Sequence, residues 1–234
     1  MNRVVPLLTG EVYHVYNRGA HKQDIFRSVD DYQRLLMLLY LANRMGPINF
    51  RNIKKRNKGL TFARLVELES ADQSLVDILA YCLLPNHFHL VLKQKTEHGI
   101  SKFLQKTSTA YSMYFNLCHG HSGTLFQGRF RSRHLDTDPY FKWSFSYLHL
   151  NPTSLVEPEW KKKGIRDPGR ASKFLKDYLY SSYYDYYVGK RPERAILAYT
   201  EAINLIDKEQ DFNAMLVDFS KGKIHFPVVE NELS

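Results

Sequence analysis

The sequence has few cysteines, fewer acidic than basic residues, and no long apolar run. Its two cysteines, Cys82 and Cys118, cannot form a disulfide framework or a four-thiolate metal site, so both are expected to be buried thiols. No apolar run approaches the roughly 18 residues that span a bilayer, and the first residues lack the features of a signal peptide. These absences predict a cytoplasmic protein that does not enter a membrane.

The shortage of acidic residues leaves 33 Lys and Arg against 24 Asp and Glu, a net charge of +9. Such a charge favours a polyanionic partner, because Lys and Arg release condensed counterions when they neutralise phosphates. Sixteen tyrosines and fourteen phenylalanines accompany the basic residues. Unpaired bases can stack on such rings, although most of the rings are expected to fill the core.

Hydrophobic patterning divides the first 152 residues into strands and helices. Their order is strand, helix, strand, strand, helix, strand, which is typical of an α+β, ferredoxin-like (split β-α-β) antiparallel sheet with two helices on one face. The other face is expected to be free. The predicted elements are a strand at 11–17, a helix from Asp30, strands at 75–84 and 87–93 joined by Pro85-Asn86, a helix at 100–118 ended by Gly120, and a strand at 129–136.

A basic insertion, residues 46–73, interrupts this order. Its GPINFRNIKKRNKG stretch is polar and broken by Gly and Pro, so we expect an exposed segment. Lys54, Lys55 and Arg56 are candidate DNA contacts, although a merely solvated loop is the simpler interpretation.

The remaining chain divides at Pro152, which disfavours continuation of a helix that begins at Asp138-Pro139. We expect a catalytic domain over 1–152, a basic linker and aromatic segment over 153–192, and a helical C-terminal appendage over 193–234. The appendage should contain helices near 194–206 and 211–219.

His87 and His89 are candidate metal ligands. They are two residues apart on a predicted strand, so both imidazoles leave the same face, whereas Phe88 and Leu90 point to the helix-covered layer. Two nitrogens on one face can reach one ion. Because a His-x-His pair often arises by chance, its value depends on what else reaches that face.

Tyr147 and Asn151 are one turn apart on the predicted helix 138–150, away from an apolar stripe formed by Phe141, Phe145 and Leu148. Two imidazoles and the Asn151 amide oxygen would suit Mn²⁺ or Mg²⁺ and leave positions for phosphate oxygens. A tyrosine hydroxyl beside that phosphate could attack phosphorus. The alternative is a tyrosine that only packs against the sheet, with Asn151 ending the helix.

Arginines supply further candidate DNA contacts. Arg129, Arg131 and Arg133 alternate along the last predicted strand and could form a row that binds phosphates, although an ordinary exposed edge strand is the alternative. Arg18, at the end of the first strand, is a further candidate. Tyr111 has helical spacing to apolar neighbours and is interpreted as a packing residue.

Several motifs in this order resemble the single-tyrosine transposases of the HUH endonuclease superfamily, particularly the REP-associated tyrosine transposases. The resemblance covers most of residues 11–152. The motifs are YHVYNRG at Tyr13 to Gly19, LPNHFHLVL at Leu84 to Leu92, GTLFQGRF at Gly123 to Phe130, and YLHLNP at Tyr147 to Pro152, with a downstream SSYYDYYVG at Ser181 to Gly189.

The resemblance implies roles for four residues. By position, the paired metal-binding histidines fall on His87 and His89, the nucleophile on Tyr147, and the third, amide-bearing ligand on Asn151. It also implies a Mg²⁺ or Mn²⁺ cofactor, single-stranded DNA with a hairpin as partner, and cleavage through a 5′-phosphotyrosine that leaves a free 3′ hydroxyl. Members of the family differ in how subunits share helices, so both a monomer and a homodimer remain open.

Three functions therefore compete. The first is a metal-dependent single-stranded DNA endonuclease and strand transferase. The second is a non-catalytic protein, derived from a transposase, that binds structured DNA or RNA. The third is a metal-dependent phosphodiesterase that uses water in place of the tyrosine. A tyrosine one turn before a candidate ligand is required only by the first.

Overall fold

A four-stranded sheet organises the chain, for which the computed structural model describes residues 6–69 and 73–206. The strands lie in the order β2-β3-β1-β4, and all neighbours are antiparallel. With one helix between β1 and β2 on the sheet and another between β3 and β4, this is the ferredoxin-like topology, and the predicted fold class is confirmed. The strands are β1 (Val12–Arg18), β2 (Val76–Leu84), β3 (His87–Gln94) and β4 (Arg131–His134).

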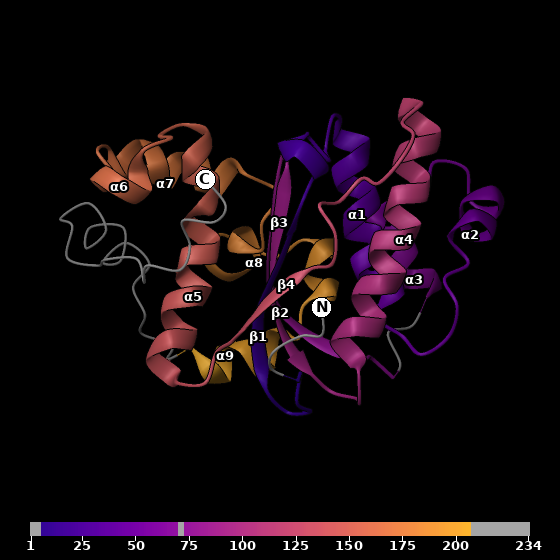
Figure 1. Ribbon diagram of the computed structural model, residues 1–234, viewed down its shortest axis with the longest axis horizontal. Coiled ribbons are helices and arrows are strands. Elements are labelled where there is room, and N and C mark those ends of the chain that lie inside the picture. Colours follow the sequence, from indigo (N-terminus) through magenta and orange to yellow (C-terminus); the bar gives the residue numbers. More distant parts are fainter. Residues whose placement is uncertain (1–5, 70–72, 207–234) are drawn as a thin grey trace.

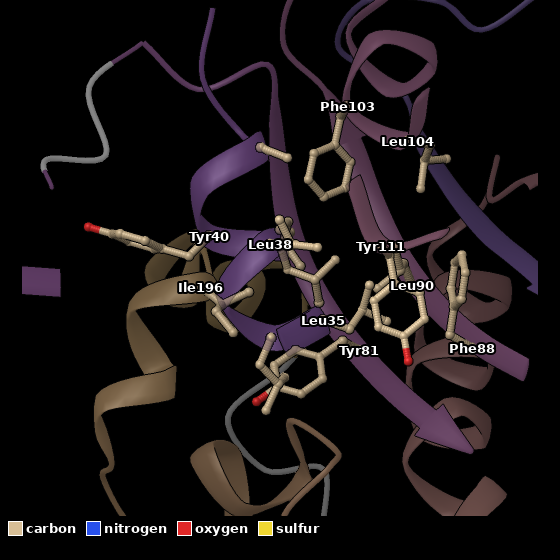
Figure 2. Packing of buried hydrophobic residues seen from close by; sticks show 14 of the residues in the cluster. Leu35, Leu38, Tyr40, Tyr81, Phe88, Leu90, Phe103, Leu104, Tyr111 and Ile196 are labelled. Atoms are coloured by element: carbon tan, nitrogen blue, oxygen red, sulfur yellow. The ribbon is translucent and has the colours of Figure 1, made fainter. Parts of the chain in front are cut away.

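Helices α1 (Val29–Ala42) and α4 (Gly99–His119) cover one face of the sheet (Figure 1). Ser28 caps α1 in a capping box with Asp31, so that the helix begins one residue before its predicted start, and Gly120 ends α4 at φ +60°. Figure 2 shows side chains of both helices meeting those of β2 and β3. Burial of each Leu or Phe side chain there contributes about 1.5–3 kcal/mol to the free energy of folding. The labelled residues of this core include Leu35, Leu38, Tyr81, Phe88, Leu90, Phe103 and Tyr111.

We had expected the opposite face to be free, but it is covered. Helices α5 (Asp138–Leu150) and α9 (Tyr199–Leu205) pack on its β2–β3 part. Several sheet residues that point to this face are apolar, among them Ala80, Cys82 and Val91, and they require a cover. A strand buried on both faces appears as a continuous apolar run, and β2 has such a run.

The segment 153–172 is not the open linker that its polar sequence predicted. It forms the 3-10 helix η2 (Asn151–Leu155), α6 (Trp160–Lys163) and the beginning of α7 (Pro168–Asp177). Trp160, Ile165 and Ala171 are buried in one apolar cluster with residues of α5. Single apolar residues spaced through a basic stretch give no periodic signal, so the sequence did not indicate this packing.

The chain after α7 covers the outer edge of β2. Backbone N–H groups of Leu83 and Ser182 donate to the carbonyl oxygens of Tyr180 and Tyr81, both at 2.9 Å. These hydrogen bonds satisfy groups that an edge strand would leave exposed. The elements α8 (Tyr183–Tyr187) and η3 (Pro192–Ile196) follow before α9, and the predicted helix at 211–219 lies outside the described residues.

The basic insertion is helical rather than a loop. It contains α2 (Phe50–Arg56) and α3 (Phe62–Leu68), whose Phe50, Phe62 and Leu65 are buried in the core that α1 and α4 share. Figure 1 shows α2 beyond the α1–α4 layer, on the opposite side of the sheet from α5. These three apolar residues are too far apart in the sequence to form a helical pattern, so the two short helices were not predicted.

Smaller differences concern single residues. Cys82 is buried as expected, but Cys118 is exposed near the end of α4. Tyr111 is buried and donates its hydroxyl proton to the Ile25 carbonyl, as its packing interpretation requires. Within the described ranges, no helix is both long and apolar enough to cross a membrane.

A buried ion pair holds the C-terminal segment to β2. The Arg191 guanidinium donates to the Asp185 carboxylate at 2.8 Å and to the Tyr81 hydroxyl at 2.9 Å. Burial raises the pKa of Asp185 above its usual range, whereas the Arg191 charge lowers it. Arg191 therefore compensates a carboxylate that has little contact with water.

Arg191→Ala is expected to reduce the free energy of unfolding by about 3–5 kcal/mol near neutral pH, because one partner of a buried pair is left alone. An unpaired buried carboxyl has a pKa above its unfolded value of about 3.9, so the loss should shrink as the pH falls toward that value. Urea unfolding of both proteins measures the difference. The exposed Arg170→Ala is the control, and an equal loss in both variants would contradict the role of the pair.

Candidate functional site

His87 and His89 share one face of β3, as predicted. His89 lies opposite Tyr16 of β1 and Cys82 of β2, and His87 lies opposite Arg18 of β1. Their ring centroids are 5.0 Å apart, with the planes at 82°. This face is the one that α5 partly covers, because Cys82 belongs to the cluster that packs under α5.

Asn86 determines which nitrogen of His87 carries the proton. Its side-chain oxygen lies 2.5 Å from Nδ1 of His87, and its amide nitrogen donates to the Lys22 carbonyl at 3.4 Å. A carboxamide oxygen can only accept, so Nδ1 of His87 must be the donor. The lone pair of His87 is then on Nε2, which is the tautomer that a metal ligand requires.

His14 of β1 forms the corresponding contact with His89, at 2.9 Å between Nε2 of His14 and Nδ1 of His89. His89 is fully buried, and its Nε2 has no hydrogen-bond partner among the described residues. Sequence reasoning missed His14. The alternating polarity of its strand was a signal present in the sequence. The sequence did not show that β1 pairs with β3, and this pairing brings the two rings together.

All three imidazoles are neutral at physiological pH. Burial, assisted by the charges of Arg133 and Lys161, lowers the pKa of His14 to about 3. Burial and the charges of Lys161 and Arg18 lower the pKa of His87 to about 3, and burial holds the pKa of His89 well below 6.5. Neutral imidazoles keep the lone pairs that bind metal ions without first losing a proton.

Tyr147 is buried between two tryptophans, with 1% of its surface exposed. Its ring stacks on that of Trp143 at 5.1 Å and 8°, and the ring of Trp160 lies 6.0 Å away. The Tyr147 hydroxyl oxygen accepts a hydrogen bond from the ammonium group of Lys161. The tyrosine thus packs against α6, in a cluster separate from the apolar stripe of α5.

Asn151 continues the helical geometry of α5, with φ −53° and ψ −37°, and its backbone N–H donates to the Tyr147 carbonyl. The two residues are therefore one turn apart, as predicted. The Asn151 side chain is fully buried, and neither its oxygen nor its nitrogen has a hydrogen-bond partner in the part of the chain that is described. A buried carboxamide without partners costs free energy and is available to a ligand.

Helix α5 brings its C-terminal end to the histidine face. Its Leu148 packs in the same cluster as Cys82 and Leu84, the β2 residues opposite His89 and His87. Lys161, which holds the Tyr147 hydroxyl, is also close enough to lower the pKa of both histidines. The predicted nucleophile and ligand pair are therefore on the same side of the sheet.

The candidate DNA-binding arginines divide into two groups. Arg18, Arg129 and Arg131 line one cavity of about 810 Å³, together with the rings of Tyr16 and Phe126. A second cavity of about 890 Å³ shares these two rings and the last two arginines.

Arg133 instead lies opposite His14 in the register of β4 with β1. Arg129 precedes β4, which is shorter than the predicted strand, so only Arg131 and Arg133 alternate on it. The candidates on α2, namely Lys54, Lys55 and Arg56, are exposed but lie beyond the α1–α4 layer and do not join the site.

The donors at this face fit a hard divalent ion only if Asn151 takes part. No group of three His, Cys, Asp or Glu side chains that could hold a metal ion is present in residues 6–69 and 73–206. His89 and Asn151 nevertheless contribute buried polar atoms without partners. Mixed nitrogen and oxygen donors of this kind can bind Mg²⁺ or Mn²⁺ and leave positions for phosphate oxygens.

Comparison with known proteins gives one family match. Residues 53–149 match the family described as "Transposase IS200 like", and this segment includes His87, His89 and Tyr147. The resemblance that the motifs carry is therefore confirmed for that segment, which is similar to these transposases. No curated protein matches the chain. A solved structure of a REP-associated tyrosine transposase bound to a REP hairpin aligns with a TM-score of 0.45 at 14% identity, over 79% of this chain and 83% of that one.

Asn151→Leu is expected to raise the free energy of unfolding by about 1–3 kcal/mol, because an apolar side chain of similar shape removes two buried polar atoms without partners. Asn17→Leu is the matched control. Its amide donates to the Gly128 carbonyl and its oxygen accepts from the Arg18 N–H, so the same change should destabilise the protein. Chemical denaturation measures both, and a destabilised Asn151→Leu protein would contradict an uncompensated amide.

Proposed function

We propose that this relative of the IS200-like transposases cuts and rejoins single-stranded DNA through Tyr147, with a divalent metal held at the histidine face. One observation carries the proposal. The segment that matches the family contains His87, His89 and Tyr147, and the fold brings this tyrosine to the side of the sheet from which both imidazoles project. The residues implied by the resemblance thus come from elements that pack together.

In the proposed reaction, the Tyr147 oxygen attacks the phosphorus of a phosphodiester. The bond from phosphorus to the 3′ oxygen breaks, the phenolic proton passes to solvent water, and the leaving 3′ oxygen takes a proton from solvent water. The products are a 5′-phosphotyrosine and a free 3′ hydroxyl. Attack by a 3′ hydroxyl on the phosphotyrosine reverses the step without ATP, because the phosphodiester bond energy is conserved.

His87, His89 and Asn151 would hold the metal. The side-chain oxygen of Asn86 and the ring of His14 orient the two imidazoles, as second ligand shells do in metal sites. For His89, the ligating tautomer requires that Nδ1–H donate to Nε2 of His14. A bound Mg²⁺ or Mn²⁺ would polarise the scissile phosphate.

We propose that the DNA strand passes through the arginine-lined cavities. Arg18, Arg129 and Arg131 provide positive charge for phosphates, and the rings of Tyr16 and Phe126 provide faces on which bases stack. Arg18 lies opposite His87 in the sheet, which links the cavity to the proposed metal site. Single-stranded DNA with a hairpin is the proposed partner, as the resemblance implies.

One observation favours a different function, namely a non-catalytic protein that binds structured nucleic acid. Tyr147 is 1% exposed, so a phosphate reaches its hydroxyl only if side chains packed around it move. A binder would use the basic cavities and need no such movement. The two functions differ in whether a covalent protein–DNA product forms.

Tyr147→Phe is expected to abolish covalent product while leaving DNA binding within about twofold, because only the attacking oxygen is removed and the ring still packs. The protein is incubated with a library of single-stranded hairpins and Mn²⁺ or Mg²⁺, and the products are separated on a denaturing gel. Tyr140→Phe, on the same helix, is the matched control and should keep wild-type activity.

Each outcome distinguishes the competing functions. If the wild type and Tyr140→Phe form covalent product and Tyr147→Phe does not, the proposal is supported, and chelation of the metal should then stop product formation. Binding without product across the library supports the non-catalytic protein. Cleavage that persists in Tyr147→Phe supports the hydrolase that uses water.

The arginines predict a specific salt dependence. Arg129→Gln should weaken binding of hairpin DNA and flatten the plot of log affinity against log salt by about 0.7–1, because one phosphate contact is lost. Lys54→Gln removes the same charge from α2, beyond the opposite layer of the fold, and should leave the slope unchanged. Fluorescence anisotropy at several salt concentrations measures both, and an equal change in the two variants would contradict the proposed path.

A further inference from the structure

Three successive lysines in α6 have different environments. Lys162 and Lys163 are exposed, and Lys163 pairs with Glu159 one turn earlier at 2.6 Å. Lys161 is only partly exposed, and its ammonium group donates a hydrogen bond to the Tyr147 hydroxyl oxygen. One lysine of a basic run is therefore directed at the proposed nucleophile.

We propose that Lys161 is a catalytic residue of strand cutting and rejoining, because its ammonium group contacts the Tyr147 oxygen and would stabilise the negative charge that develops on this oxygen during attack and departure. The inference rests on the proposed function and adds to it a residue outside the 53–149 family match. Nothing in the motifs assigned a role to this basic run.

The packing of α6 supports this position. Trp160, the residue before Lys161, is 1% exposed and lies against the Tyr147 ring. The Lys161 nitrogen is 4.8 Å from the centroid of the same ring. Burial of the tryptophan thus anchors α6 beside α5 and limits where the ammonium group can lie.

The charge of Lys161 also reaches the histidine face. It lowers the pKa of His14, His87 and His89, which lie on two strands of the sheet. The ammonium group that contacts the Tyr147 hydroxyl is therefore also near the proposed metal ligands. A cation there is favourable to the phosphate and to a phenolate together.

In cutting, the bond from the Tyr147 oxygen to phosphorus forms as the bond to the 3′ oxygen breaks. Lys161 keeps its proton throughout and stabilises the phenolate character of the attacking oxygen. In rejoining, the tyrosine oxygen is the leaving group and gains the same negative charge. One ammonium group therefore assists both directions.

The test compares three variants of the full chain on a hairpin substrate that the wild type cuts. Lys161→Met removes the charge and keeps a long apolar side chain, Lys161→Arg keeps the charge, and Lys162→Met removes a charge from the neighbouring exposed position. Thermal unfolding, DNA affinity and the single-turnover rate of covalent product formation are measured for each, with saturating DNA for the rate.

Lys161→Met is expected to lower the rate at saturating DNA about 100-fold, in the range of lost transition-state hydrogen bonds, with affinity within about threefold. Lys161→Arg should recover at least tenfold of this loss, and Lys162→Met should match the wild type. If Lys161→Met is folded and reacts at the wild-type rate, the role of Lys161 is overturned and the proposed function is not.

Two other results would also overturn this role. Equal losses in Lys161→Met and Lys161→Arg, with lowered unfolding temperatures in both, would indicate that the lysine only supports the packing of α6. No covalent product from the wild type on any hairpin would overturn the proposed function, and the role of Lys161 with it.

Discussion

Packing of α5 against the β2–β3 half of the sheet is the constraint on which the site depends. Leu148 is buried with Cys82 and Val91, and this contact brings the end of α5 to the face that carries His87 and His89. A ferredoxin-like sheet with only α1 and α4 would bury one face and leave the two histidines without a tyrosine. The apolar residues on both faces of β2 and β3 supply the free energy for the second layer.

Some buried polar groups are fully paired, whereas others at the candidate site have no partner among the described residues. Asp31, on the α1–α4 side, accepts hydrogen bonds from the backbone of Arg27, from Ser28 and from Tyr114, and Asp185 is paired with Arg191. At the candidate site, Nε2 of His89 and the Asn151 amide are buried without hydrogen-bond partners among the described residues. Buried polar groups without partners are available to a ligand, at a cost to stability.

Electrostatics at this face combine neutral ligands with fixed cations. Burial keeps the imidazoles unprotonated, whereas Lys161, Arg18 and Arg133 supply positive charge around them. Such a field is unfavourable to protonated histidines and favourable to phosphate. Tyr147 is also buried, so the packing around the proposed nucleophile also restricts access to it.

The sequence alone determined the elements whose signals are local. Alternation located β1, the Pro85-Asn86 turn joined β2 to β3, and a two-residue period put His87 and His89 on one face. Four-residue spacing likewise placed Tyr147 and Asn151 one turn apart. Tertiary structure decided everything that depends on distant pairing, including the contact of His14 with His89 and the cover over the second face. It also directed Lys161 toward Tyr147, because one lysine in a basic run differs from its neighbours only in what packs against it.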